Sequence, residues 1–313
     1  MSIAFIFPGQ GSQAVGMGAE LAKTYPSARA VFDEVDVALS QNLSRLMWEG
    51  PEAELTLTEN AQPALMVVSL AAMRVLADKG LKLPGRVAYV AGHSLGEYSA
   101  LAASGALSVA DTARLLKIRG RAMQQAVPVG QGAMAALLGA DLAQAQDLAK
   151  AAAEGEVCEA ANDNAPGQVV ISGAKSAIER ALALAPKFGA RRAVLLPVSA
   201  PFHCALMQPA ADVMRDALAK VAINAPSVPV IANVLATQVS DPEAIRARLV
   251  EQVTGMVRWR ETMLYLKAKG VATVYEVGAG RVLAGIARRF DGVEARSVGT
   301  PDELEAAAAA LAA

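Results

Sequence analysis

Two kinds of hydrophobic pattern alternate along the chain. Short unbroken apolar runs, such as residues 87–91, are typical of buried strands, whereas apolar residues spaced by three and four, as in residues 109–127, are typical of helices. Their succession predicts an α/β fold in which helices cover a parallel sheet. The predicted strands are residues 3–7, 87–91, 228–234 and 271–277, and the predicted helices are residues 18–24, 28–39, 62–79, 109–127, 205–219 and 303–313.

The middle of the chain has a different order of elements. Strand, helix, strand, strand, helix and strand are predicted at residues 133–138, 142–153, 157–161, 168–172, 176–185 and 193–198. This order is that of the ferredoxin-like, or split βαβ, unit. Glycines and prolines punctuate both of its sides, at 128–132 and 197–201. We therefore expect residues 128–199 to form an inserted small subdomain within a large α/β subdomain made of residues 1–127 and 200–313.

The clearest chemical signal follows the strand predicted at 87–91. Residues 92–96 read Gly-His-Ser-Leu-Gly, a G-x-S-x-G sequence that precedes a run of small residues typical of a helix. Glycines suit a sharp strand-to-helix turn, because a Cβ on either side would collide with the neighbouring elements. At the helix N-terminus, backbone N–H groups, first that of Leu95, can stabilise a developing acyl oxyanion. We interpret Ser94 as a nucleophile; an ordinary Gly-Ser loop is the alternative.

The sequence offers little choice of a base for this serine, because its two histidines are His93 and His203. His93 adjoins Ser94 in the tight turn, so we expect its ring to point away from the hydroxyl. His203 lies in a proline-containing loop before a helix, where catalytic groups are common, and we interpret it as the base rather than as a structural histidine. No Asp or Glu adjoins Ser94 or His203, so a backbone carbonyl is one group that could orient the ring.

One arginine lies on the apolar face of the helix predicted at 109–127. Arg119 is spaced by four from both Leu115 and Met123, whereas the other cations of this helix share the opposite face. A buried guanidinium is costly unless it meets a carboxylate. That carboxylate belongs either to an internal Asp or Glu or to a substrate.

Composition narrows the classes of function. A net charge of −1 and an aromatic content of 4% argue against a nucleic-acid surface. No stretch of about eighteen residues lacks charges and no basic leader precedes the first strand, so we expect a cytoplasmic protein without a membrane span. Two cysteines and two histidines do not form a metal-ligand spacing. Gly9-x-Gly11-x-x-Ala14 matches a dinucleotide fingerprint in letters only, because the acids that follow lie in a helix pattern.

Taken together, the motifs resemble those of the malonyl-CoA:acyl carrier protein transacylase family. The resemblance implies an α/β-hydrolase-like core with a ferredoxin-like insertion, in agreement with the pattern above. It spans essentially the whole chain. It rests on Phe-Pro-Gly-Gln-Gly-Ser-Gln at 7–13, Gly-His-Ser-Leu-Gly-Glu-Tyr at 92–98, Arg119, Phe202-His203, and residues 162–170 and 275–278.

The resemblance also implies a role for each matching residue. Ser94 would be acylated, with His203 as base and then acid. The backbone N–H of Gln10 would join that of Leu95 in an oxyanion hole. Gln252 matches the residue whose main-chain carbonyl orients the histidine, although the Gly-Met that follows at 255–256 replaces the family's commoner Asn-Pro.

The implied activity is ping-pong transfer of malonyl from coenzyme A to the phosphopantetheine thiol of acyl carrier protein, without a bound cofactor or metal. Arg119 matches the arginine that binds the free malonyl carboxylate, and Phe202 matches a position linked to malonyl selectivity. Two rivals are a serine esterase or thioesterase and a non-catalytic subunit that docks a carrier protein. A buried cation at Arg119 favours the transferase, because a simple esterase does not need one.

Overall fold

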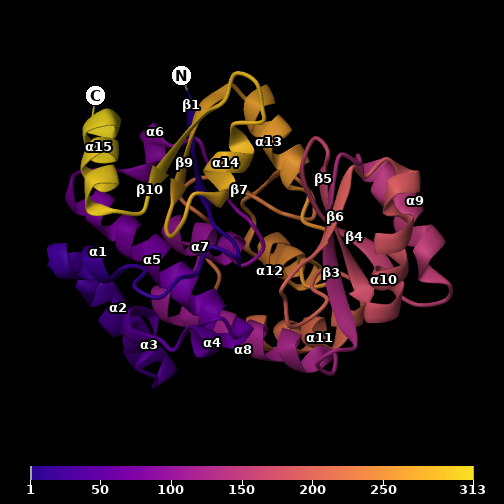
Figure 1. Ribbon diagram of the computed structural model, residues 1–313. Coiled ribbons are helices and arrows are strands. Elements are labelled where there is room, and N and C mark those ends of the chain that lie inside the picture. Colours follow the sequence, from indigo (N-terminus) through magenta and orange to yellow (C-terminus); the bar gives the residue numbers. More distant parts are fainter. Residues whose placement is uncertain (1, 313) are drawn as a thin grey trace.

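The computed structural model describes residues 2–312 and contains two β-sheets (Figure 1). The larger sheet has six strands. Its strands are β1 (Ser2–Phe7), β2 (Tyr89–Gly92), β7 (Val230–Ile231), β8 (Gln238–Val239), β9 (Val271–Val277) and β10 (Glu294–Val298). Their order is β10-β9-β1-β2-β7-β8, and all neighbours run parallel except β7 and β8. All four predicted strands lie in this sheet, but the run predicted at 228–234 forms a strand of only 2 residues.

Helices fill most of the remaining chain. They are α1 (Ala19–Thr24), α2 (Pro26–Leu39), α3 (Leu43–Glu49), α4 (Glu52–Leu55), α5 (Thr58–Asp78), α6 (Leu83–Arg86), α7 (Gly96–Ala103), α8 (Val109–Ala126), α9 (Leu142–Ala153), α10 (Lys175–Leu184), α11 (Gln208–Leu218), α12 (Pro242–Glu251), α13 (Trp259–Ala268), α14 (Val282–Ala287) and α15 (Pro301–Ala312). The predicted helices are present, and residue 313, at the end of the last of them, lies outside the described residues.

Several elements were not predicted from the sequence. Helices α3, α4, α6 and α14 have 7, 4, 4 and 6 residues, which is too few to show a hydrophobic period. Strands β8 and β10 are edge strands of 2 and 5 residues, and an edge strand carries a weaker apolar signal because one side lacks a neighbour. Helices α12 and α13 were also missed.

Both faces of the large sheet are buried, which explains why β1 is an unbroken apolar run. Phe5 and Phe7 pack into the core on the side of α2, α5 and α8. Ala4 and Ile6 face the opposite side, where α13 and α14 cover them. Successive side chains of a strand point to opposite faces, so a strand covered on both faces needs apolar residues at every position.

Helix α5 is the longest helix and the centre of the larger core. By length and composition alone it could cross a membrane, but 89% of its most apolar window is buried inside the protein. Figure 1 shows it running behind the loops that follow β1, between α2 and the sheet. Its apolar character therefore matches its place as a core helix.

The second sheet has four antiparallel strands. They are β3 (Gly132–Leu138), β4 (Cys158–Ala165), β5 (Gln168–Ala174) and β6 (Arg192–Leu195), in the order β4-β5-β3-β6. Helices α9 and α10 cover one face with their own core, to which β3 contributes Ala135 and Leu137. Met134 of β3 faces the other way and joins the larger core. The predicted β-α-β-β-α-β order is thus present, with a last strand shorter than the predicted 193–198.

Three contacts attach strand β4 to the larger part of the protein. Asn162 forms an isolated parallel bridge with Val257. The next residue, Asp163, accepts a hydrogen bond of 2.8 Å from Arg260 on α13. Asn164 contacts the ring of His93 at 2.8 Å. The edge of the second sheet is therefore fixed beside the G-x-S-x-G segment.

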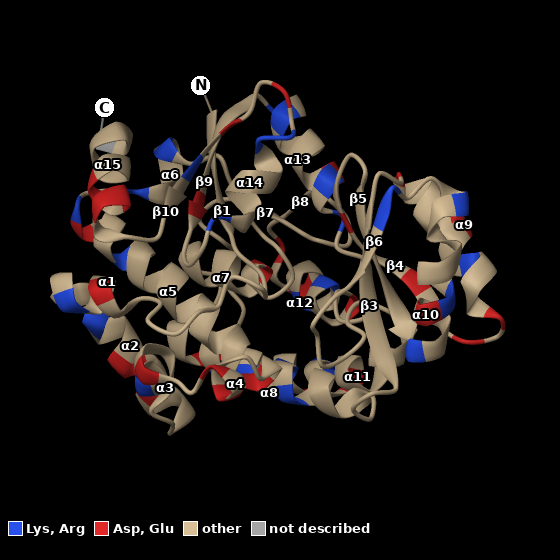
Figure 2. Cartoon of the chain, viewed as in Figure 1, with Lys and Arg blue, Asp and Glu red and all other residues tan. Residues whose placement is uncertain are grey.

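Charged residues of both signs are interspersed along the outer helices, as Figure 2 shows for α2, α3 and α10. This mixture agrees with the net charge of −1. Many form short-range pairs, such as Arg29 with Asp33 and Arg45 with Glu49, both at i,i+4 spacing. Pairs of this kind are exposed and contribute little to stability.

Candidate active site

Ser94 stands on a sharp turn between β2 and α7. Its φ is +52°, in the left-handed region that a non-glycine residue rarely adopts. A Cβ on Gly92 would lie 1.8 Å from the oxygen of Gly96, and one on Gly96 would lie 2.3 Å from the oxygen of Phe7. Both glycines are therefore required by the turn, as the sequence predicted.

His203 meets the serine across 109 positions of sequence, with Ser94 Oγ 2.8 Å from its Nε2. The other ring nitrogen, Nδ1, lies 2.9 Å from the main-chain oxygen of Gln252 and 3.1 Å from that of Gly255. Because carbonyl oxygens only accept hydrogen bonds, Nδ1 carries the proton. The Nε2 lone pair then faces Ser94, and the serine hydroxyl donates to it.

The second histidine, His93, points elsewhere. Its Nε2 lies 2.8 Å from Oδ1 of Asn164, and its ring packs against Trp259 at a centroid distance of 5.5 Å. Glycine at position 9 permits this arrangement, because a Cβ there would lie 2.8 Å from the His93 oxygen. The expectation that His93 faces away from the Ser94 hydroxyl is confirmed.

Arg119 reaches the serine from helix α8. Its side chain is buried, at 1% exposure. Nη1 donates to Oε1 of Gln62 at 2.8 Å, while Nη2 donates to Oε1 of Gln252 at 2.8 Å and to Oγ of Ser94 at 3.1 Å. Among residues 2–312 it forms no ion pair, so the alternative of an internal carboxylate partner is wrong. The guanidinium lies beside the Ser94 hydroxyl and forms no ion pair within the described residues.

These residues line a cavity of about 460 Å³ between the two sheets. The loop after β1 supplies Gln10, and Leu95 follows the serine on the same wall. Within the described chain, no acceptor takes the backbone N–H of either residue. Two free N–H groups beside a nucleophile are the requirement for an oxyanion hole. The lining comprises Gln10, Gly11, Gln13, Glu52, Thr56, Gln62, His93, Ser94, Leu95, Arg119, Met123, Met134, Asn162, Leu196, Pro197, Val198, Phe202 and His203.

The electrostatics of the cavity keep the candidate base neutral. Burial, followed by the positive charge of Arg119, lowers the pKa of His203 to about 3. A neutral imidazole is the form that can accept a proton from Ser94. Burial also lowers the pKa of Arg119, and the charge of nearby Glu97 opposes that change.

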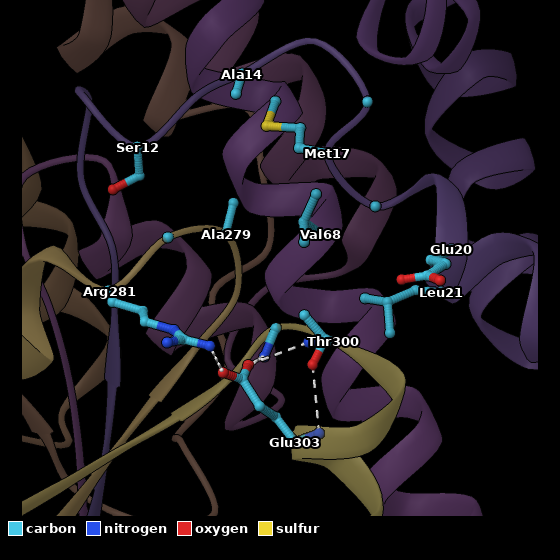
Figure 3. A pocket seen from close by; sticks show the side chains of 14 residues that line it. Ser12, Ala14, Met17, Glu20, Leu21, Val68, Ala279, Arg281, Thr300 and Glu303 are labelled. Atoms are coloured by element: carbon cyan, nitrogen blue, oxygen red, sulfur yellow. Dashed lines mark hydrogen bonds and ion pairs between the residues drawn. The ribbon is translucent and has the colours of Figure 1, made fainter.

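A second cavity, shown in Figure 3, is lined by Ser12 and Ala14 of the loop after β1, whereas Gln10 of the same loop lines the cavity of Ser94. It encloses about 380 Å³ and has Ser12, Arg281 and Glu303 among its lining residues. Arg281 is already paired with Glu303 at 2.7 Å, and neither histidine lines this cavity. The chemistry is therefore concentrated in the cavity of Ser94.

No function was assigned from the sequence to three buried polar residues of the site, Gln62, Glu97 and Asn233. Asn233 accepts a hydrogen bond of 2.8 Å from the Ser94 N–H and donates one of 2.7 Å to the oxygen of Gly92. The position of Glu97 could have been predicted, because a residue one helical turn after Ser94 lies on the same side of the helix. Gln62 and Asn233 gave no such signal, since polar residues of this kind are common in loops and helix ends.

Comparison with known proteins agrees with this geometry. The acyl transferase domain family matches residues 4–301. The malonyl CoA-acyl carrier protein transacylase of Escherichia coli (strain K12) is 48% identical over 305 residues, which are 97% of this chain and 98% of that protein.

Solved structures give the same result. The acyl-carrier-protein S-malonyltransferase of Bartonella henselae is 56% identical, with a TM-score of 0.98 and full coverage of both chains, 100% each. A malonyl-transacylase in complex with a type II polyketide synthase acyl carrier protein is 41% identical, with a TM-score of 0.96, over 99% of this chain and 100% of that one. The chain belongs to the acyl transferase family, among its malonyl CoA-acyl carrier protein transacylases.

Proposed function

We propose that this protein transfers malonyl from coenzyme A to the phosphopantetheine thiol of acyl carrier protein through a malonyl-Ser94 intermediate. The observation that carries the proposal is that Ser94 Oγ contacts both a histidine nitrogen at 2.8 Å and an unpaired buried guanidinium at 3.1 Å. The first contact suits acyl transfer, and the second suits an acyl group that ends in a carboxylate. The names of the relatives supply malonyl-CoA and acyl carrier protein as the partners.

In the first half-reaction, Nε2 of His203 takes the proton of Ser94 as Oγ attacks the thioester carbon. The negative charge forms on the carbonyl oxygen, where the N–H groups of Gln10 and Leu95 stabilise it. The carbon–sulfur bond then breaks, and His203 returns the proton to the departing coenzyme A sulfur. The main-chain oxygen of Gln252 holds the ring through Nδ1 during both steps.

The second half-reaction repeats these steps in reverse. His203 takes the proton of the carrier-protein thiol, whose sulfur attacks the malonyl-Ser94 carbon. The carbon–oxygen bond of the acyl-serine breaks, and His203 returns the proton to Ser94 Oγ. Coenzyme A and acyl carrier protein each carry their own pantetheine arm, so the chemistry needs no bound cofactor.

Binding of the substrate carboxylate to Arg119 also changes the basicity of His203. Burial and then the positive charge of Arg119 lower the pKa of His203. A malonyl carboxylate neutralises that charge when it binds, so the histidine becomes a better base when the correct acyl group is present. Phe202 is buried in the same wall, at 8% exposure, and limits the room beside the acyl group.

The fold supports a finer description of the architecture. We infer an α/β-hydrolase-like core, residues 1–127 and 200–313, with a ferredoxin-like insertion at 128–199. The support is the strand order β4-β5-β3-β6 of the second sheet and the G-x-S-x-G turn at the end of parallel strand β2. A cytoplasmic location follows from the proposed partners, coenzyme A and acyl carrier protein.

Intact-protein mass spectrometry tests the proposed function. After brief incubation with malonyl-CoA and removal of the excess, we expect one malonyl group on the wild type and none on Ser94→Ala. The label should persist in buffer and disappear rapidly when acyl carrier protein is added, because the carrier thiol is positioned near His203 whereas water is not. Loss of the label at the same rate without an acceptor would identify a hydrolase. Absence of any label would identify a docking subunit.

A further inference from the structure

Glu97 is a buried carboxyl group that the chemistry above does not use. It lies in the first turn of α7, at 3% exposure, three residues after the nucleophile. Its Oε2 accepts hydrogen bonds of 2.7 Å from Nε2 of Gln252 and 3.1 Å from the backbone N–H of Asn233. Burying a carboxyl group costs free energy of folding, so a buried carboxyl group beside the candidate active site indicates a functional role.

The side-chain amide of Gln252 lies between Glu97 and Arg119. Its Nε2 donates to Glu97 at 2.7 Å and to the Ser94 main-chain oxygen at 2.9 Å. Its Oε1 accepts from Nη2 of Arg119 at 2.8 Å. The amide can make these bonds in one orientation only, because the carboxylate and the carbonyl accept while the guanidinium donates. Turned over, it would place its NH₂ group against the cation.

We propose that Glu97 is a positioning residue that holds the guanidinium of Arg119 in place for the malonyl carboxylate, acting through the amide of Gln252. The inference rests on the proposed function. By accepting from Nε2, Glu97 fixes which end of the amide faces Arg119. Among residues 2–312, no direct ion pair joins Glu97 to Arg119, so the guanidinium keeps its net charge for a substrate.

The indirect arrangement has a physical advantage over a direct ion pair. A carboxylate in contact with Arg119 would occupy its bidentate fork, and substrate would have to displace it. A neutral amide oxygen orients Nη2 without neutralising the cation. Nη2 also donates to Ser94 Oγ at 3.1 Å. An incoming carboxylate therefore has to displace only the neutral serine oxygen from Nη2, and not another carboxylate.

The ratio of kcat/KM for malonyl-CoA to kcat/KM for acetyl-CoA isolates this function. Both rates come from the same sample, so the ratio does not depend on the folded fraction. Acetyl has no carboxylate, so effects of Glu97 on Ser94 through Asn233 lower both rates and cancel. We expect Glu97→Ala to lower the ratio about tenfold or more, the scale of losing a hydrogen bond to a charged group. Glu97→Gln keeps an accepting oxygen and should lower it less than about threefold.

Two further variants complete the design. Arg119→Ala should lower the ratio by itself, and Glu97→Ala added to it should lower the ratio no further, because both act on one interaction. Glu276→Ala is the matched control. That carboxyl group is also buried, at 0% exposure, accepts from the N–H groups of Leu283 and Ala284, and does not line the cavity of Ser94. Its loss should reduce stability and leave the ratio unchanged.

The inference is overturned if Glu97→Ala keeps the wild-type ratio, or if Glu97→Gln lowers the ratio as much as Glu97→Ala does. It is also overturned if Glu97→Ala lowers the ratio as much in the Arg119→Ala background as in the wild type. Glu97→Met, which fills the volume without a carboxylate, replaces the alanine variant if that one does not fold. Failure of the proposed function gives a different result, because the wild type itself would then not prefer malonyl-CoA.

Discussion

At the scale of single residues, the proposed nucleophile and the proposed base share an unusual backbone conformation. Ser94 has a φ of +52° and His203 a φ of +58°, both in the left-handed region. For residues with a Cβ this conformation costs about 1–3 kcal/mol each. The surrounding structure holds both in place, through Asn233 on the Ser94 N–H and through two carbonyls on the His203 ring. The strain is thus found where the two groups must meet at 2.8 Å.

The titration of His203 can be measured directly, because the chain has two histidines. Burial and Arg119 lower the pKa of His203 to about 3, and burial also lowers the pKa of His93. We expect NMR of histidine-labelled protein to show a neutral His203 ring throughout the range from about pH 5 to 8. In Arg119→Ala the pKa of His203 should rise. A midpoint near the ordinary value of 6.5 in the wild type would contradict the geometry.

The same shift has a consequence for stability. A histidine whose pKa is lower in the folded protein binds fewer protons there than in the unfolded chain between pH 3 and 6.5. Its contribution to the free energy of unfolding is therefore complete above pH 6.5 and is lost as the pH falls toward 3.

At the scale of elements, the position of Arg119 depends on how closely α8 approaches α5. The next residue, Gly120, makes this approach possible. A Cβ there would lie 2.5 Å from the oxygen of Thr58 and 2.6 Å from the Cα of Glu59. Glycine weakens a helix by about 1 kcal/mol relative to alanine, so its presence inside α8 indicates a packing requirement.

Two glycine-to-alanine variants separate helix propensity from packing. Gly120→Ala should lower the free energy of unfolding by about 1–3 kcal/mol, because the backbones of α5 and α8 must separate. It should also weaken malonyl transfer, since Arg119 moves with its helix. Gly285→Ala in α14, where nothing lies within 4 Å of the added Cβ, should instead raise stability by up to about 1 kcal/mol. Thermal unfolding measures both. Equal stabilisation by the two variants would refute the close-packing argument.

At the scale of the whole molecule, the cavity exists because the two sheets are held at a fixed distance. Its walls come from the turn after β2 of the large sheet, at Ser94, and from the second sheet, at Met134 of β3 and at Leu196 directly after β6. The ion pair between Asp163 of β4 and Arg260 of α13 connects the second sheet at 2.8 Å to a helix that covers the large sheet, with the Asp163 side chain 1% exposed. Burial raises the pKa of Asp163, and Arg260 opposes this shift.

Removing the cation of this pair should destabilise the protein in a pH-dependent way. In Arg260→Ala the pKa of Asp163 in the folded protein rises further. The free energy of unfolding therefore falls as the pH rises through this raised pKa, because the folded protein then has to hold an unpaired buried carboxylate. We expect a loss of about 3 kcal/mol at pH 8 and a smaller loss at pH 5, measured by thermal unfolding. Adding Asp163→Asn should remove the pH dependence. Arg45→Ala, which breaks a pair with 71% and 64% exposed side chains, is the control and should cost under about 1 kcal/mol. Equal losses at both pH values would contradict the prediction.

The sequence by itself determined the local features of this protein. Buried strands such as β1, long helices such as α8 and the glycines around Ser94 all follow from interactions between residues close in sequence. The inward direction of Arg119 also followed from its spacing along one helix. Composition added the choice of His203 as the proposed base, because the chain has one other histidine, His93. These features were predictable because hydrophobic period and steric conflict act over a few residues.

Only the tertiary structure decided which groups meet. The partners of the Ser94 hydroxyl lie 109 and 25 positions away, and three partners of the Gln252 amide lie 133, 155 and 158 positions away. No local pattern encodes such distances, because they result from how whole elements pack. The same packing left Arg119 without an internal carboxylate and placed Glu97 one amide away from it. The sequence thus determines the chemical type of each residue. Its pKa, its orientation and its partners depend on how segments distant in the sequence pack around it.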